Sequence, residues 1–215
     1  MTRTLLAATM VALLLGLAAT ALRSATTLAA VPSKPRIATI RPWIATTRRC
    51  NSRVESGNFV DGLPAFFRRQ IRAGPLVLVA RNYTSSPASS FMHVPNRPQR
   101  YYPQKLLVLV RAGASVVLAV AWSERNHVGL LYDPSKWGRP YGVGFAVADG
   151  DRAVRFRACA ATKKNFQGDG VVGKWTEFNG GVIVAGARCA AFDVYRTGRT
   201  EPSRRVVSFG RGECS

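Results

Sequence analysis

The chain has 215 residues, of which 31 are basic and 11 acidic, so its formal net charge is +20 at pH 7. Hydrophobic residues make up 47% of it, which is too large a share for an intrinsically disordered chain. The 19 glycines and 12 prolines exclude collagen-like and low-complexity classes. The length fits one domain of ordinary size with room for a real core.

The first 30 residues have the pattern of an export signal. Residues 4–22 contain no charged side chain, Arg3 precedes them, and Ala19-Thr20-Ala21 fits a small-residue cleavage motif. We therefore expect a secreted or extracytoplasmic protein of the cell envelope. An uncleaved N-terminal membrane anchor is the alternative, since about 18 apolar residues can span a bilayer. Removal of residues 1–30 takes away two basic residues and no acidic one, which leaves a net charge of +18.

The four cysteines agree with export. Cys50, Cys159, Cys189 and Cys214 are even in number, which in an exported chain indicates two disulfides. The absence of a C-x-x-C motif excludes a thioredoxin-type site and argues against a zinc ribbon. Three connectivities are open. We favour Cys159–Cys189, joining two strand ends across a glycine-rich loop, and Cys50–Cys214, joining the N-terminal arm to the last strand.

The mature chain divides into an arm and a domain. Residues 31–49 contain three prolines and scattered basic residues, which predicts an extended basic arm. Residues 50–215 then form a single domain. Its one helix is predicted over Leu63–Ala73, where Asp61 can cap the first turn and Gly74-Pro75 stops the last.

After this helix the hydrophobic pattern changes to short apolar or alternating runs, which indicate strands. Asp149-Gly150 suits a two-residue type I′ hairpin, and Ala112-Gly113-Ala114 predicts a hairpin or a tight turn. About nine strands at regular spacing with one short helix predict an all-β fold, an antiparallel, Ig-like β-sandwich. The candidate runs are Leu76–Arg81, Lys105–Arg111, Ser115–Trp122, Val143–Ala148, Asp151–Cys159, Val171–Thr176, Gly181–Gly186, Cys189–Arg196 and Arg204–Gly210, with Val128–Tyr132 as a further short one.

No catalytic, cofactor-binding or metal site is indicated. The only histidines, His93 and His127, lie far apart, and the chain has no G-x-S-x-G motif and no glycine-rich phosphate loop. Asp149 and Asp151 are the closest conspicuous carboxylates, and because they bracket a turn glycine we interpret them as turn residues. We expect a non-enzymatic protein without cofactors. An envelope enzyme with an unrecognised hydrolytic site remains the alternative.

Groups of basic residues are the only positive functional signal. Outside a cell, a domain of this charge is drawn to anionic wall polymers and anionic lipid head groups, and an envelope protein is the third possible partner. The export signal argues against nucleic acid, and the oligomeric state is open. A solvated surface is the other interpretation, since arginine supplies 25 of the 31 basic residues and codon bias in a high-GC genome explains part of that excess. Further basic groups lie at 48–53, 97–100 and 196–205. The candidate contacts for a polyanion are Arg68, Arg69, Arg72, Arg152, Arg155, Arg157, Lys163 and Lys164.

Four stretches carry a family resemblance: QKLLVLVRAGASVVLAV (104–120), RACA (157–160), GKWTEFNGGVIVAGARCAAFDV (173–194) and RRVVSFGRGEC (204–214). With the signal peptide they resemble an uncharacterised family of small secreted β-sandwich proteins of high-GC Gram-positive, actinobacterial bacteria. The resemblance implies a disulfide between Cys159 and Cys189, with Cys214 closing the domain. It implies no catalytic residues. Trp175, Phe178, Gly180 and Gly181 are expected to serve the turn and the core.

Overall fold

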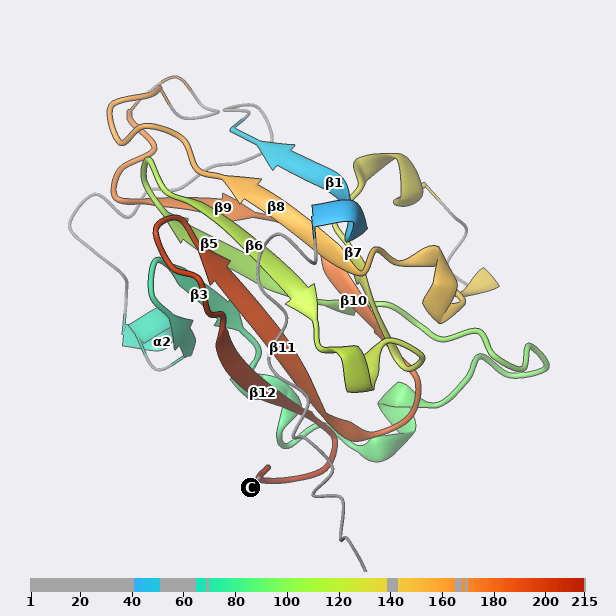
Figure 1. Ribbon diagram of the computed structural model, residues 1–215. Helices are drawn as coiled ribbons and strands as arrows, with labels where there is room; N and C mark the ends of the chain where they lie inside the picture. The colour runs from blue at the N-terminus through green and yellow to red at the C-terminus, as the bar shows by residue number, and fades with distance from the viewer. Residues whose placement is uncertain are drawn as a thin grey trace, which may run out of the picture. The chain divides into compact units, whose positions relative to one another are not determined.

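The computed structural model describes residues 41–50, 65–68, 70–138, 143–164, 168 and 170–214, all of them in one compact unit. These residues form twelve strands in three sheets and one short α-helix (Figure 1). The predicted signal peptide and residues 31–40 of the predicted arm lie outside the described residues. The helix is α2 (Ala65–Arg68), and the strands are β1 (Ile44–Arg49), β2 (Ile71–Ala73), β3 (Leu76–Val79), β4 (Gln104–Lys105), β5 (Leu107–Arg111), β6 (Ser115–Val120), β7 (Val128–Leu131), β8 (Ala153–Arg157), β9 (Trp175–Phe178), β10 (Gly181–Val184), β11 (Arg188–Arg196) and β12 (Ser203–Phe209).

The largest sheet has five strands in the order β1-β8-β6-β11-β12, and β6, β8 and β11 cross the front of Figure 1. The other two sheets have the orders β2-β3-β5-β9 and β4-β10-β7. Every named pair is antiparallel except β1 with β8, which is parallel. The expectation of a purely antiparallel fold is wrong at this pair, because the arm enters the sheet in the same direction as β8.

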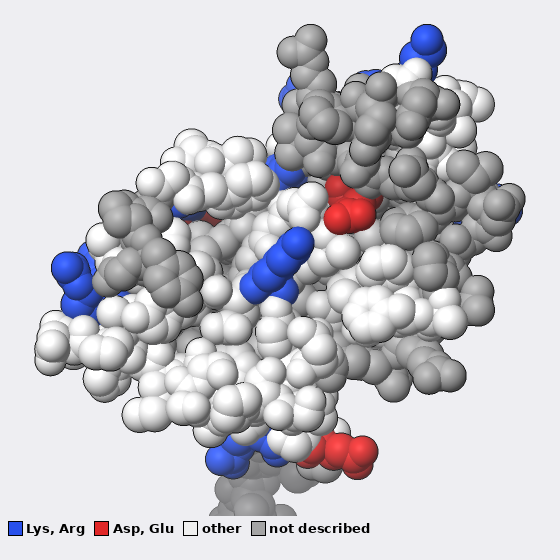
Figure 2. Space-filling model, turned by 180° about the vertical axis from the view of Figure 1, so that it is seen from behind, with Lys and Arg blue, Asp and Glu red and all other residues white. Residues whose placement is uncertain are grey.

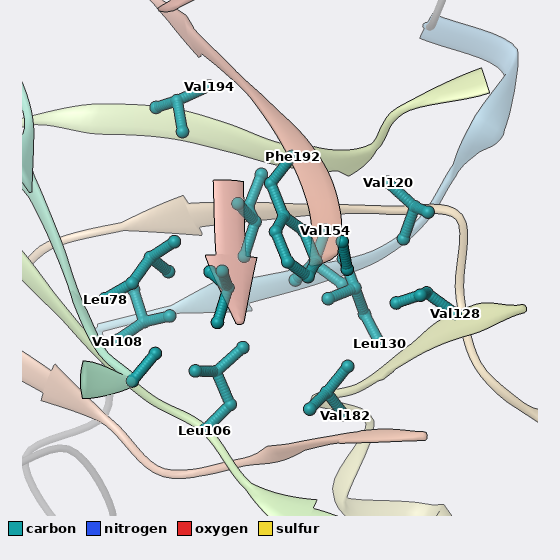
Figure 3. Packing of buried hydrophobic residues seen from close by; sticks show 14 of the residues in the cluster. Leu78, Leu106, Val108, Val120, Val128, Leu130, Val154, Val182, Phe192 and Val194 are labelled. Atoms are coloured by element: carbon teal, nitrogen blue, oxygen red, sulfur yellow. The ribbon is translucent and has the colours of Figure 1, made fainter. Parts of the chain in front are cut away.

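One hydrophobic core joins the three sheets. Alternate residues of the strands turn inward, as a period of two requires, and residues such as Leu118, Leu78 and Val182, one from each sheet, belong to the same buried cluster. Figure 3 shows side chains of this cluster, among them Leu78, Val182 and Phe192, converging from strands far apart in the sequence. Phe178 lies in this cluster, as expected from the sequence.

Two buried tyrosines hold the junction between β4 and β5. The hydroxyl of Tyr83 donates to the carbonyl of Lys105, and that of Tyr132 donates to the carbonyl of Leu106. Burial raises the pKa of Tyr83 to about 12 and that of Tyr132 well above its ordinary value, so both hydroxyls stay protonated. Gly180 makes room for the Tyr132 ring, because a Cβ there would lie 2.2 Å from it.

The predicted helix over Leu63–Ala73 is largely wrong. In the described part only Ala65–Arg68 is helical, and Ile71–Ala73 is strand β2. Gly74, with φ +62°, turns the chain so that β2 pairs with β3, Ile71 facing Leu78. The glycine therefore makes a hairpin turn instead of ending a helix, and strand pairing overrides the helical pattern. Asp61, Leu63 and Pro64 lie outside the described residues.

The predicted type I′ hairpin at Asp149-Gly150 is also wrong. Val147–Asp149 forms a 3-10 turn in which the Asp149 carboxylate accepts from the amide of Ala146, and Gly150 has φ −85°. Gly150 is required for a close approach instead, since a Cβ there would lie 2.6 Å from the backbone of Gly129. The turn at 112–114 is tight, as predicted, and it leads from β5 in one sheet to β6 in another.

Two disulfides are present, but their connectivity differs from the favoured one. Cys50 pairs with Cys159, at a Cα–Cα distance of 4.7 Å, and Cys189 pairs with Cys214, at 5.8 Å. Because β1 and β8 are parallel, the ends of both strands lie together, which brings Cys50 beside Cys159. Similarly, the antiparallel β11–β12 pair places the start of β11 beside the end of β12.

The two disulfides should differ in their effect on stability. The Cys50–Cys159 loop spans 109 residues and the Cys189–Cys214 loop 25. Chain entropy gives about 4.7 kcal/mol for a 100-residue loop and about 3 kcal/mol for a 15-residue loop. The double variant C50S/C159S should therefore unfold at lower urea concentration than C189S/C214S. The reverse order, or a peptide map joining Cys159 to Cys189, would contradict the structure.

Tyr132→Phe should lower the free energy of unfolding by about 1–3 kcal/mol, because the buried carbonyl of Leu106 loses its hydroxyl donor. Urea unfolding measures the change. Tyr101→Phe is the control, since the Tyr101 hydroxyl has no hydrogen-bond partner among the described residues. Its effect should stay within about 0.5 kcal/mol. Equal stability of the two variants would show that the Tyr132 hydroxyl contributes nothing.

Candidate functional site

Arginines gather on the outer face of the five-stranded sheet at the end of β8. Val154 and Phe156 point into the core, so the alternate residues Arg155 and Arg157 point outward. In the parallel pair with β1, Arg157 lies beside Arg49. On its other side, β6 places Ser115 beside Arg157 and Val117 beside Arg155.

A pocket of about 200 Å³ opens on this face next to Arg155. The connection from β11 to β12 forms one wall, where Gly198, with φ +74°, allows a tight turn. The hydroxyl of Thr197 donates to the carbonyl of Ser115, which fastens this turn to the start of β6. The polar lining is Ser115, Arg155, Tyr195, Arg196, Thr197 and Arg199.

The positive charges around the pocket are available for a ligand. Within the described part of the chain, the side chains of Arg49, Arg155, Arg157 and Arg199 have no hydrogen bond or ion pair. We call these four residues the arginine surface. Arg196 differs, because its side chain runs toward Gly74 of the β2–β3 turn and its Nη2 donates to the hydroxyl of Ser203.

Two carboxylates act on Tyr195 near the pocket, and one of them is neutralised. Asp193 is only 1% exposed and accepts two hydrogen bonds from Arg204, at 2.9 and 3.0 Å. Burial raises the pKa of the Tyr195 phenol, with Asp193 and Glu201 adding to the rise and Arg204 opposing it. Tyr195 therefore lines the pocket as a neutral group, and the exposed Glu201 is the acid left near it.

The structure separates the eight residues predicted to contact a polyanion. Arg155 and Arg157 belong to the arginine surface. Arg152 is tied to the fold, because its guanidinium donates to the carbonyls of Arg125 and Val128, and burial followed by the charge of Arg125 lowers its pKa.

The remaining predicted contacts lie elsewhere or outside the described part. Arg72 is exposed on β2, where its backbone carbonyl accepts a hydrogen bond from Arg205 of β12, and it does not line the pocket. Lys163 and Lys164 are exposed in the turn after Cys159 and do not line it either. The Arg68 side chain and Arg69 lie outside the described residues. Arg49 and Arg199 were missed as contacts. They belong to basic runs in the sequence, but only the strand register brings Arg49 beside Arg157, and only the β11–β12 connection brings Arg199 to the pocket beside Arg155.

The opposite side of the molecule looks different. Figure 2 shows the view from behind, where most described residues are neither acidic nor basic and a few isolated charges appear.

Among the described residues, no three His, Cys, Asp or Glu side chains are grouped so that they could hold a metal ion. No helix in the described part is long and apolar enough to span a membrane. Comparison of the chain with protein families, curated proteins and solved structures finds no match.

Arg204→Ala should lower the free energy of unfolding by about 3 kcal/mol, because the buried carboxylate of Asp193 loses both of its hydrogen-bond donors. Thermal or urea unfolding measures the loss. Arg211→Ala removes an exposed arginine at the other end of β12 and should change stability by less than about 0.5 kcal/mol. If both variants unfold alike, the Asp193–Arg204 pair does not hold the face together.

Proposed function

We propose that the mature chain is an exported, disulfide-stabilised domain of the cell envelope that binds an anionic wall polymer and catalyses no reaction. The observation behind the proposal is the arginine surface around the pocket. Four guanidinium groups that share a face and have no partner in the described part of the chain repel one another. An anion at this face relieves that repulsion and forms charge-assisted hydrogen bonds.

The compartment rests on two observations. All four cysteines are joined in two disulfides, and disulfides persist in oxidising, extracytoplasmic surroundings. The sequence of residues 1–30 supplies the matching export signal. We also infer that the sheets form a β-sandwich of the secreted family that the sequence resembles, with the five-stranded sheet as one layer.

A polymer suits the site better than a single small anion. The arginine surface extends from β1 across β8 to the β11–β12 connection, so it offers charges in a row instead of one deep cage. Polymers with a phosphodiester or carboxylate group on each repeat can pair with several of these arginines at once, and the contacts reinforce one another. Arginine side chains remain charged at any pH found outside a cell, so the attraction does not depend on a titrating group of the protein.

Arg155→Ala with Arg199→Ala should weaken binding to inorganic polyphosphate at least tenfold, since two guanidinium partners are lost. Titration calorimetry at several salt concentrations measures the affinity. Wild-type binding should also weaken as salt rises, more steeply than that of the variant.

The control, Arg97→Ala with Arg211→Ala, removes the same charge from two exposed residues that do not line the pocket. An equal loss in this control would show that only the net charge matters. Binding to vesicles of anionic lipid but to no soluble polymer would favour a lipid surface instead. Binding to neither would leave a protein partner as the better hypothesis.

A further inference from the structure

A second group of positive charges lies beyond the end of β8, in the connection to β9. Within this connection residues 159–164 run antiparallel to residues 171–174, and the amide of Val172 donates to the carbonyl of Lys163 at 2.7 Å. We call these two segments the lysine ribbon. Figure 1 shows the connection, in orange, extending past the ends of both strands.

The ribbon concentrates lysine in a chain that otherwise uses arginine. Arginine supplies 25 of the 31 basic residues, and three of the six lysines lie here, all of them exposed: Lys163, Lys164 and Lys174. Within the described part of the chain, their ammonium groups have no hydrogen bond or ion pair. Asp169, the one acidic residue of this connection, lies outside the described residues. A codon bias toward arginine does not explain why lysines gather at this place.

The lysine ribbon adjoins the arginine surface through the tight turn at 112–114. The first residue of the turn, Ala112, donates from its amide to the carbonyl of Lys174 at 2.8 Å. Ser115, which follows the turn, pairs with Arg157 of the arginine surface. The turn consists of two alanines and a glycine, and a Cβ added to this glycine would meet no atom within 4 Å. No large side chain of the turn therefore stands between the two groups of charges.

We propose that the lysine ribbon is a second contact for the polymer bound at the arginine surface, so that the domain prefers long anionic chains to short ones. The inference rests on the proposed function and adds chain length to what the site recognises. An ammonium group on a flexible stem binds an anion as a point charge, without the fixed geometry of a guanidinium. A polymer held by the arginines is then held a second time by the ribbon.

The separation of the two contacts sets the length of chain that gains from both. Arg155, beside the pocket, and Lys163 are eight residues apart, so their Cα atoms lie at most about 29 Å from each other. A polyphosphate of several tens of units is longer than this. Tripolyphosphate has fewer anionic groups than the arginine surface has arginines, so it gains little from further lysines. Binding of a long chain at one contact raises its effective concentration at the other.

A triple alanine variant of the ribbon tests the inference with these two ligands at the same salt concentration. Its affinity for long polyphosphate should fall about tenfold, because the second contact is lost, and its affinity for tripolyphosphate should change less than about twofold. Titration calorimetry measures both affinities. The substitutions are Lys163→Ala, Lys164→Ala and Lys174→Ala.

Two further variants separate a local contact from net charge. Arginine at the same three positions keeps the charge and should retain most of the affinity for the long chain. The matched control removes three exposed basic residues outside both contacts and should weaken the long chain less than about twofold, since distant exposed charges are screened by salt. Its substitutions are Arg97→Ala, Lys105→Ala and Arg211→Ala.

The outcomes separate this inference from the proposed function. If the ribbon variant weakens the long chain no more than the control does, or weakens both ligands equally, the second contact is overturned. Equal affinity of the wild type for both ligands would also overturn it, because chain length would then not be recognised. In each of these cases the anionic polymer stands if Arg155→Ala with Arg199→Ala weakens both ligands. If the wild type binds neither ligand, the proposed function fails as well.

Discussion

The parallel pairing of β1 with β8 is the constraint from which much of the molecule follows. It sets which side chains of β1 face inward and which face outward. Arg48, only 5% exposed, points inward, where its guanidinium donates to the carbonyls of Tyr132 and Asn179 and lies over the Trp137 ring. Arg49 points outward beside Arg157. The same pairing brings Cys50 to Cys159, so one strand of the arm determines a disulfide, a buried cation and an edge of the arginine surface.

The buried guanidinium of Arg48 ties β1 to the rest of the fold. Burial is the main influence on Arg48 and lowers its pKa, while Tyr132 and Asp133 oppose that shift. The charge is tolerated because carbonyl oxygens and an aromatic face replace the water that it loses. Tyr132 directly follows β7 and Asn179 directly follows β9, which belong to the other two sheets, so Arg48 links the edge strand to the rest of the fold. The outward arginines that follow it on the sheet are thereby set on a fixed support instead of on a loose arm.

Features that depend on the local residue pattern, such as the positions of strands, were predicted well from the sequence. Features that depend on the direction of a strand and on its pairing register were predicted poorly. The continuous apolar runs at 76–79 and 115–120 and the alternation at 153–157 each predicted a strand that the structure contains, because a strand covered on both faces is apolar throughout and one with an outward face alternates. The predictions of a helix at 63–73 and of a hairpin at 149–150 failed because Gly74 and Gly150 each fit two structures. Pairing of β2 with β3 decided the first, and the close approach of Gly129 decided the second. The disulfide connectivity depended on whether β1 runs parallel to its neighbour, which the sequence of an edge strand does not reveal. The candidate site follows the same division. Arg155 was predicted from the alternating pattern of residues 153–157, whereas Arg199 was recognised only in the structure, from its position in the β11–β12 connection.

The many arginines of this chain do not all have the same role. Arg48, Arg152 and Arg204 each donate to groups of the protein itself, and their planar guanidinium groups satisfy two acceptors at once, which an ammonium group does less well. Arg49, Arg155, Arg157 and Arg199 make no such bonds within the described part of the chain. A biased codon supply explains why arginine is abundant. It does not explain why one set of arginines donates hydrogen bonds within the protein while another set lies together on one face without such bonds. That division is the physical reason to regard the outer face of the five-stranded sheet as a binding surface and Arg48, Arg152 and Arg204 as part of the structure.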